Sequence, residues 1–141
     1  SLIQSSSLKN HEKLLIEKIN ETLELLNLSD MKDSYARELS GGQKKLLELA
    51  RSIINEPEIL LLDEPLAGVN PKLAEDILSL IKKLSNKGIT ILMVEHNIEA
   101  VMKISDRIVV LAEGSLIADG NPNDIRTDTN VIEAYLGKDN D

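Results

Sequence analysis

The chain has 141 residues, a formal net charge of −8, two aromatic residues and no cysteine. This length is enough for one domain with a buried, aliphatic core, and the lack of cysteine excludes disulfides and thiolate metal sites. The acidic charge and the absence of Lys and Arg clusters argue against a nucleic-acid surface, and no apolar run approaches the roughly 20 residues of a membrane-spanning helix.

Two segments precede the first motif. Residues 1–10 are polar and Ser-rich, which predicts a disordered or terminal segment. Residues 12–27 carry Leu15, Ile19, Leu23 and Leu26 on one stripe, which predicts an amphipathic helix. The stripe fits either ordinary packing or a partner-binding face.

The first motif is Leu-Ser-Gly-Gly-Gln at residues 39–43. Ser40 is a good helix cap, and Gly41 and Gly42 leave backbone N–H groups uncovered where a helix begins, a place that attracts anions. The apolar spacing after Gln43 predicts a helix to about residue 54. On its own, the motif fits a flexible turn before a helix equally well.

The second motif is an unbroken apolar run, residues 59–62, that ends in Asp63 and Glu64. Such a run predicts a parallel strand covered on both faces. Acids at the carboxyl end of a parallel strand point into the crevice where open α/β sheets bind ligands. On its own, the pair fits a solvated strand end equally well.

The next segment adds a helix and a second apolar strand that ends in polar residues. Asn70 is a good N-cap with Pro71 at the first helical position, which predicts a helix to about residue 86. Residues 89–94 predict a second buried strand, which ends at Glu95-His96. Strand, helix and strand in this order predict a parallel sheet.

The remaining elements are short. Asn97 caps a predicted helix, residues 108–111 form a third strand, and Glu113-Gly114 turns the chain into an antiparallel hairpin over residues 116–118. Two short helices over 122–126 and 130–136 follow, and residues 138–141 form a frayed acidic tail.

Together the motifs resemble the nucleotide-binding subunit of ABC transporters. Residues 39–43 are similar to the ABC signature, residues 60–63 to the Walker B strand, residues 66–71 to the D-loop, and His96 to the switch histidine. Four segments have sequences that look most like the branched-chain amino acid importer branch: residues 64–71, 94–97, 105–111 and 132–137. Similar sequences occur in lipopolysaccharide-export ATPases.

The resemblance implies roles for these residues in ATP hydrolysis. Asp63 would hold Mg²⁺, Glu64 would polarise the attacking water as the catalytic carboxylate, and His96 would sense the γ-phosphate. In the family, the signature residues contact ATP held by a second nucleotide-binding subunit in a head-to-tail dimer. The cofactor-binding residues predicted here are Ser40, Gly41, Gly42, Gln43 and Asn70. Many relatives carry Asp at the position of Asn70.

The sequence contains no Gly-x-x-x-x-Gly-Lys-[Ser/Thr] motif. The resemblance therefore predicts the C-terminal portion of a longer protein. The expected fold is α/β, a partial P-loop NTPase core of the RecA type with a C-terminal β-hairpin. Residues 11–54 would be a helical-subdomain remnant with the signature helix, and residues 55–141 the C-terminal part of the core. The Walker A strand, which in the family lies between strands 89–94 and 108–111, is absent. We expect the chain alone to bind ATP poorly, and its unpaired strand edges either to be closed by rearrangement or to self-associate.

The expected partners are the second nucleotide-binding subunit and transmembrane permease subunits, at the cytoplasmic face of the cell membrane. Two other functions remain open. A soluble ABC-type ATPase of DNA repair would share the signature and Walker B motifs, but it would have coiled-coil flanks and basic grooves. A non-catalytic interaction module would keep the fold without a phosphate loop.

Overall fold

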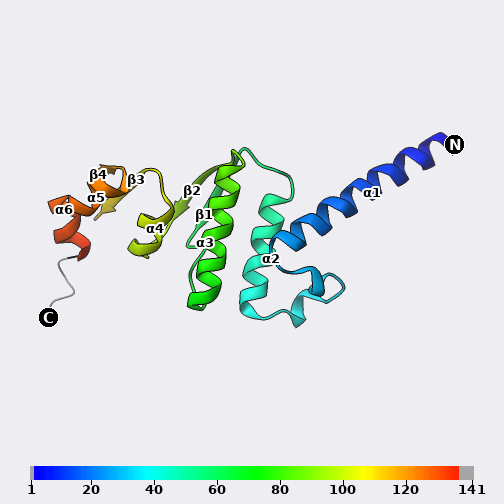
Figure 1. The fold of residues 1–141 in the computed structure, drawn as a ribbon, viewed down its shortest axis with the longest axis horizontal. Coiled ribbons are helices and arrows are strands. Elements are labelled where there is room, and N and C mark those ends of the chain that lie inside the picture. Colours follow the sequence, from blue (N-terminus) through cyan, green and yellow to red (C-terminus); the bar gives the residue numbers. More distant parts are fainter. Residues whose placement is uncertain (1, 137–141) are drawn as a thin grey trace. The chain divides into compact units, whose positions relative to one another are not determined.

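The computed structural model describes the backbone of residues 2–136 and the side chains of residues 8–135. Contacts divide the chain into two compact units, Ser1–Val94 and Glu95–Asp141, called unit 1 and unit 2 here (Figure 1). Each unit is described by itself. The predicted boundary at residues 54 and 55 stays a prediction, and the predicted acidic tail at 138–141 lies outside the described residues.

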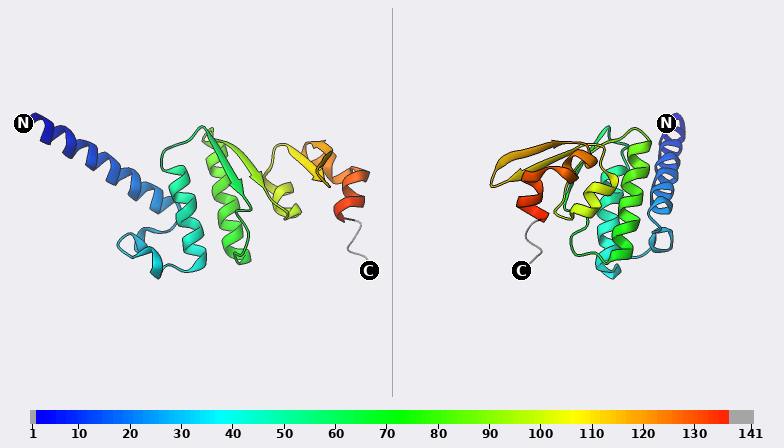
Figure 2. Two further views of the ribbon diagram at one scale, coloured as in Figure 1. Left: turned by 180° about the vertical axis from the view of Figure 1, so that it is seen from behind. Right: turned by 60° about the vertical axis from the view of Figure 1, so that its left-hand side comes forward.

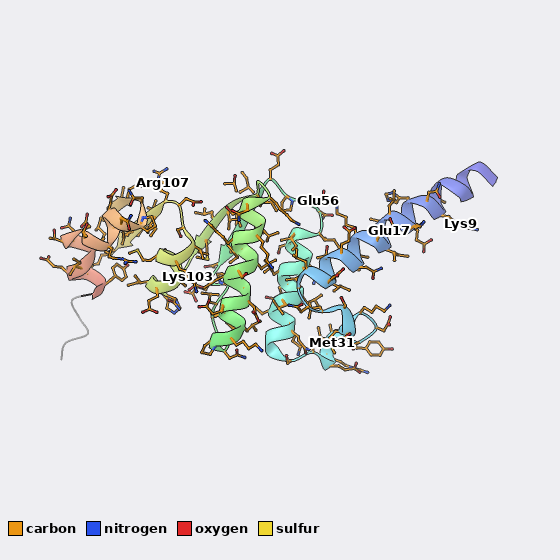
Figure 3. The ribbon with its side chains drawn as sticks, in the orientation of Figure 1. Lys9, Glu17, Met31, Glu56, Lys103 and Arg107 are labelled. Carbon is orange, nitrogen blue, oxygen red and sulfur yellow. The ribbon has the colours of Figure 1, made fainter. Side chains whose placement is uncertain are left out.

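Unit 1 begins with helix α1, Leu2–Leu25. The sequence predicted disorder over residues 1–10, whereas the helix already starts at Leu2, because no Gly or Pro interrupts the run. Its first part projects away from the rest of unit 1 and leaves Leu8 and Leu14 68% and 64% exposed (Figure 2). In the second half of the helix, Lys18 forms an ion pair of 3.2 Å with Glu56. Glu56 lies after the end of α2, where it is labelled in Figure 3.

The second helix of unit 1, α2, spans Gly41–Ile53 and follows two 3₁₀ turns, η1 (Ser29–Met31) and η2 (Ala36–Glu38). It begins two residues before the predicted start, because Ser40 caps it directly. On its inner side Leu49, Ala50 and Ile53 are buried, and Leu46 packs against the same core.

A strand, a helix and a second strand complete unit 1: β1 (Ile59–Asp63), α3 (Pro71–Asn86) and β2 (Thr90–Val94). The strands pair in parallel, with Leu60 opposite Ile91 and Asp63 opposite Val94. The predicted βαβ unit is thereby confirmed. Figures 1 and 2 show α2 and α3 lying next to one another in this unit.

The two faces of the β1–β2 sheet differ in their cover. Leu60 is 4% exposed and joins the core formed with α2 and α3, whose members include Ala50, Ile53, Leu80 and Leu84. On the other face, Ile59, Leu61, Leu92 and Val94 are between 58% and 70% exposed. The prediction of a strand covered on both faces was therefore wrong for the described residues, because α2 and α3 both pack on one side.

Unit 2 is built on an antiparallel hairpin of β3 (Ile108–Ala112) and β4 (Ser115–Gly120), as predicted. Glu113 and Gly114, with φ of 50° and 77°, make the turn. The hairpin follows α4 (Ile98–Ile104) and precedes α5 (Pro122–Thr127), α6 (Thr129–Val131) and the π-helical turn η3 (Ile132–Leu136). The core of unit 2 consists of Ile108, Ile125 and Val131.

The described strands form two separate two-stranded sheets. Within the described residues, β2 pairs only with β1 and β3 only with β4, so no strand of this part of the chain closes the predicted gap. None of the described helices combines the length and the apolar character needed to cross a membrane.

Candidate functional site

The start of α2 places the signature residues at a helix N-terminus. Ser40 and Gln43 form a capping box, in which the Gln43 N–H donates to Ser40 Oγ at 3.2 Å and the Ser40 N–H donates to Gln43 Oε1 at 2.9 Å. The Lys44 N–H donates to the Ser40 carbonyl. A helix leaves its first N–H groups without an intrahelical acceptor, so those of Gly41 and Gly42 are the donors that this arrangement offers to an anion.

The carboxyl end of β1 carries the two acids. Asp63 is the last residue of the strand, and both Asp63 and Glu64 are exposed. The Glu64 N–H donates to the Val94 carbonyl at 2.9 Å, which ties the residue after β1 to the end of β2. The pair thus lies at the edge where an open parallel sheet binds its ligands.

The backbone of Glu64 is strained. Its φ is 45°, in the left-handed region that glycine favours, and Pro65 follows it, although a residue before proline ordinarily has φ near −120°. Two hydrogen bonds fix this conformation, from the Glu64 N–H to Val94 and from the Ala67 N–H to the Glu64 carbonyl at 3.1 Å. Strain of this kind persists only when the surroundings impose it, and it gathers at functional sites.

Asn70 caps helix α3. Its Oδ1 accepts the Leu73 N–H at 2.9 Å, and Pro71 occupies the first helical position as predicted. The side chain therefore has a structural role beside the predicted contact with nucleotide, which stays a prediction.

A cavity of about 150 Å³ opens beside Asp63. It lies within unit 1 and is bounded by residues from α2, β1 and α3 together with Pro65. Its polar lining residues are Lys45, Glu48, Ser52 and Asp63. The cavity therefore continues the crevice at the carboxyl end of β1.

The Asp63 carboxylate is suited to bind Mg²⁺. Mg²⁺ in nucleotide sites usually takes one or two carboxylates together with waters and substrate phosphates. The described residues bring together no group of three or more potential metal-binding side chains, so Asp63 would act with nucleotide and water oxygens. His96 is exposed and lies in unit 2, so its predicted place beside Glu64 stays a prediction.

Comparison with known proteins decides the family. The ABC transporter family matches residues 3–67, and the branched-chain amino acid ATP-binding cassette transporter family matches residues 115–141. This chain belongs to the ABC transporter family. The first match lies in unit 1 with the signature and the acid pair, and the second lies in unit 2 with the hairpin strand β4.

Curated relatives and a solved cassette agree. The chain is 45% identical over 126 residues to a probable branched-chain amino acid transport ATP-binding protein LivG of Archaeoglobus fulgidus, with 89% of this chain and 49% of the relative covered. It is 42% identical over 138 residues to the high-affinity branched-chain amino acid transport ATP-binding protein BraF of Pseudomonas aeruginosa, with 97% and 54% covered. A crystal structure of an ABC transporter ATP-binding cassette in its ADP conformation matches with a TM-score of 0.77 and 40% identity, with 88% and 50% covered.

This chain thus spans about half the length of the curated relatives it matches. The predicted resemblance and fold class, a partial P-loop NTPase fold, are confirmed. Sequence reasoning missed two features of the site. The sequence carries no signal for the left-handed backbone of Glu64, and it places Leu73, which touches Gly42, only within a helix.

Proposed function

We propose that this chain is the C-terminal half of the ATP-hydrolysing subunit of an ABC transporter that imports branched-chain amino acids. The observation that carries the proposal is the Asp63–Glu64 pair at the carboxyl end of β1, held by the hydrogen bond from Glu64 to Val94. The family matches and the names of the relatives support the transport class and the substrate.

In this proposal each group has a task in phosphoryl transfer to water. Glu64 accepts a hydrogen bond from the attacking water and polarises it, and its strained backbone holds the carboxylate in one place. The amides of Gly41 and Gly42 stabilise charge on the γ-phosphate oxygens, and His96 steadies the same phosphate. Mg²⁺, held by Asp63, supplies charge neutralisation at the phosphates when it is bound.

The proposal includes partners and a location. The signature residues of one subunit face ATP on another in the resembled family, so the site needs a second nucleotide-binding subunit in a head-to-tail dimer. Permease subunits would place the assembly at the cytoplasmic face of the membrane. Polypeptide outside these 141 residues would supply the phosphate loop, whose motif the sequence does not contain.

The chain by itself is proposed to be inactive and to self-associate. Most phosphate-binding energy in such enzymes comes from the loop amides and lysine that this sequence lacks. In the described residues β2 has one strand neighbour, and the apolar face beside it is exposed; such edges recruit pairing from other chains. Sedimentation should show dimers or larger species, and a monomer at all concentrations would refute the self-association.

Calorimetric titration with Mg-ATP tests the proposed difference in nucleotide binding. The full-length protein should bind, and the 141-residue chain should show no measurable heat. In the full-length protein, Glu64→Gln should lower kcat by at least about 100-fold while ATP still binds, because only water activation is lost. Tight binding by the 141-residue chain, or unchanged turnover in Glu64→Gln, would overturn the assignment.

A further inference from the structure

The two glycines of the signature have different surroundings. A Cβ built on Gly42 would lie 2.5 Å from Leu73 Cδ2, closer than real Cβ contacts, and 4.0 Å from Leu73 Cγ, an ordinary van der Waals distance. A Cβ built on Gly41 would have no atom within 4 Å. An added Cβ at Gly42 would therefore displace the end of the Leu73 side chain, whereas Gly41 lies in open space.

Leu73 is itself held in place. It is the third residue of α3, its N–H is bonded to Asn70 Oδ1, and its side chain is half-buried. Asn70 ends the loop that begins after Glu64. The contacts Asn70 to Leu73 and Leu73 to Gly42 thus form a continuous link from this loop to the start of α2, all within unit 1.

We propose that Leu73 is a positioning residue that sets the place of the Gly41 and Gly42 amides relative to the loop after Glu64. The inference rests on the proposed function of those amides. Close-packed contacts transmit small displacements, and a shift of about 1 Å in a reacting group can lower a rate by about 100-fold. Leu73 would act on the reaction through Gly42 and would not touch nucleotide.

A steric role predicts rescue, which a role for the Gly42 amide alone does not. Gly42→Ala should push the Leu73 side chain and α2 apart, since Cβ and Cδ2 cannot both keep their places. Leu73→Ala removes Cδ2 and makes room for the added methyl group. The second substitution should therefore reverse much of the damage done by the first.

The activity test compares Gly42→Ala, Leu73→Ala and the double variant in the full-length protein. Gly42→Ala should lower kcat about 10- to 100-fold with KM for ATP changed less, and the double variant should recover at least about tenfold. Lys72→Ala, at an exposed position beside Leu73, is the matched control and should keep wild-type kcat. A double variant as slow as Gly42→Ala would overturn the proposal.

A stability test on the 141-residue chain separates this inference from the proposed function. Gly42→Ala should lower Tm by about 3 °C or more, Gly41→Ala should leave it within about 1 °C, and the losses from Gly42→Ala and Leu73→Ala should be less than additive. If the losses in Tm are less than additive but the full-length wild type has no ATPase activity, the contact between Leu73 and Gly42 stands and the proposed function is refuted. Additive losses in Tm would refute the contact.

Discussion

The two units stabilise their sheets in different ways. Unit 1 joins two strands through a 16-residue helix, and its core draws residues from the segment after α1 and from α2, β1 and α3. Unit 2 pairs strands that are adjacent in sequence around a two-residue turn, over a core of three buried residues. The predicted Mg²⁺ ligand and catalytic carboxylate lie in unit 1, because only parallel strands bring distant chain segments to a common carboxyl edge.

Each unit depends on different interactions. The long connection in unit 1 is ordered by apolar burial and by side chains that cap its helices, such as Ser40 and Asn70. Unit 2 adds an exposed bidentate ion pair across the hairpin, where Arg107 Nε and Nη2 donate to the two carboxylate oxygens of Asp119 at 2.8 and 2.7 Å. Substitutions should therefore have their largest effects on the covered face of unit 1 and their smallest at this pair.

The largest effect is expected at Leu60, which is 4% exposed on the covered face of β1. Leu60→Ala should lower the free energy of unfolding by about 2–5 kcal/mol, through lost burial and the cavity left behind. The neighbouring Leu61, 70% exposed, is the control, and Leu61→Ala should change it by less than about 0.5 kcal/mol. Urea unfolding of both variants measures this; equal losses would show that the second face is covered too.

The next effect is expected at the cap of α3. Asn70→Ala removes the acceptor for the Leu73 N–H and should lower the free energy of unfolding by about 1 kcal/mol. Asn70→Asp keeps an acceptor and places a negative charge at the helix N-terminus, so its stability should equal or exceed that of the wild type. Thermal unfolding followed by circular dichroism compares the three chains. A loss in Asn70→Asp as large as in Asn70→Ala would exclude the capping role.

A smaller effect, of opposite sign, is expected at Glu64. Glu64→Gly relieves the left-handed φ and should raise the free energy of unfolding by up to about 1 kcal/mol. Asp63→Gly is the control, because Asp63 has ordinary strand geometry and glycine there should be destabilising by about 0.5–1 kcal/mol. Urea unfolding decides between them, and destabilisation in both variants would mean that the Glu64 backbone stores no strain.

The smallest effect is expected at the ion pair of unit 2. Hydrogen bonding from Arg107 holds the pKa of Asp119 below its usual value, so the ionised pair stabilises the folded chain above the unfolded pKa of about 4. This contribution is lost as the pH falls through the lower folded pKa. Asp119→Asn should therefore lower Tm slightly at pH 7, and the difference should shrink toward pH 3. A difference that grows on acidification would contradict the assignment.

The local elements and the chemistry of the site followed from the sequence. Ser40, Asn70 and Asn97 were predicted as caps and are caps, because a short polar side chain before an amphipathic run is a local signal. The parallel pairing of β1 with β2 followed from the strand–helix–strand order. The acid pair was located by its position after an apolar strand.

Tertiary structure decided what depends on contacts between distant segments. An apolar run such as residues 59–62 does not tell whether one face or both are covered, and here the helices cover one. The φ of Glu64 depends on the carbonyl of Val94, 30 positions along the chain. The approach of Leu73 to Gly42 depends on how two helices pack. Local patterns in the sequence determined the family, most of the elements and their caps, whereas packing determined the open face of the sheet, the strained backbone of Glu64 and the contact of Leu73 with Gly42.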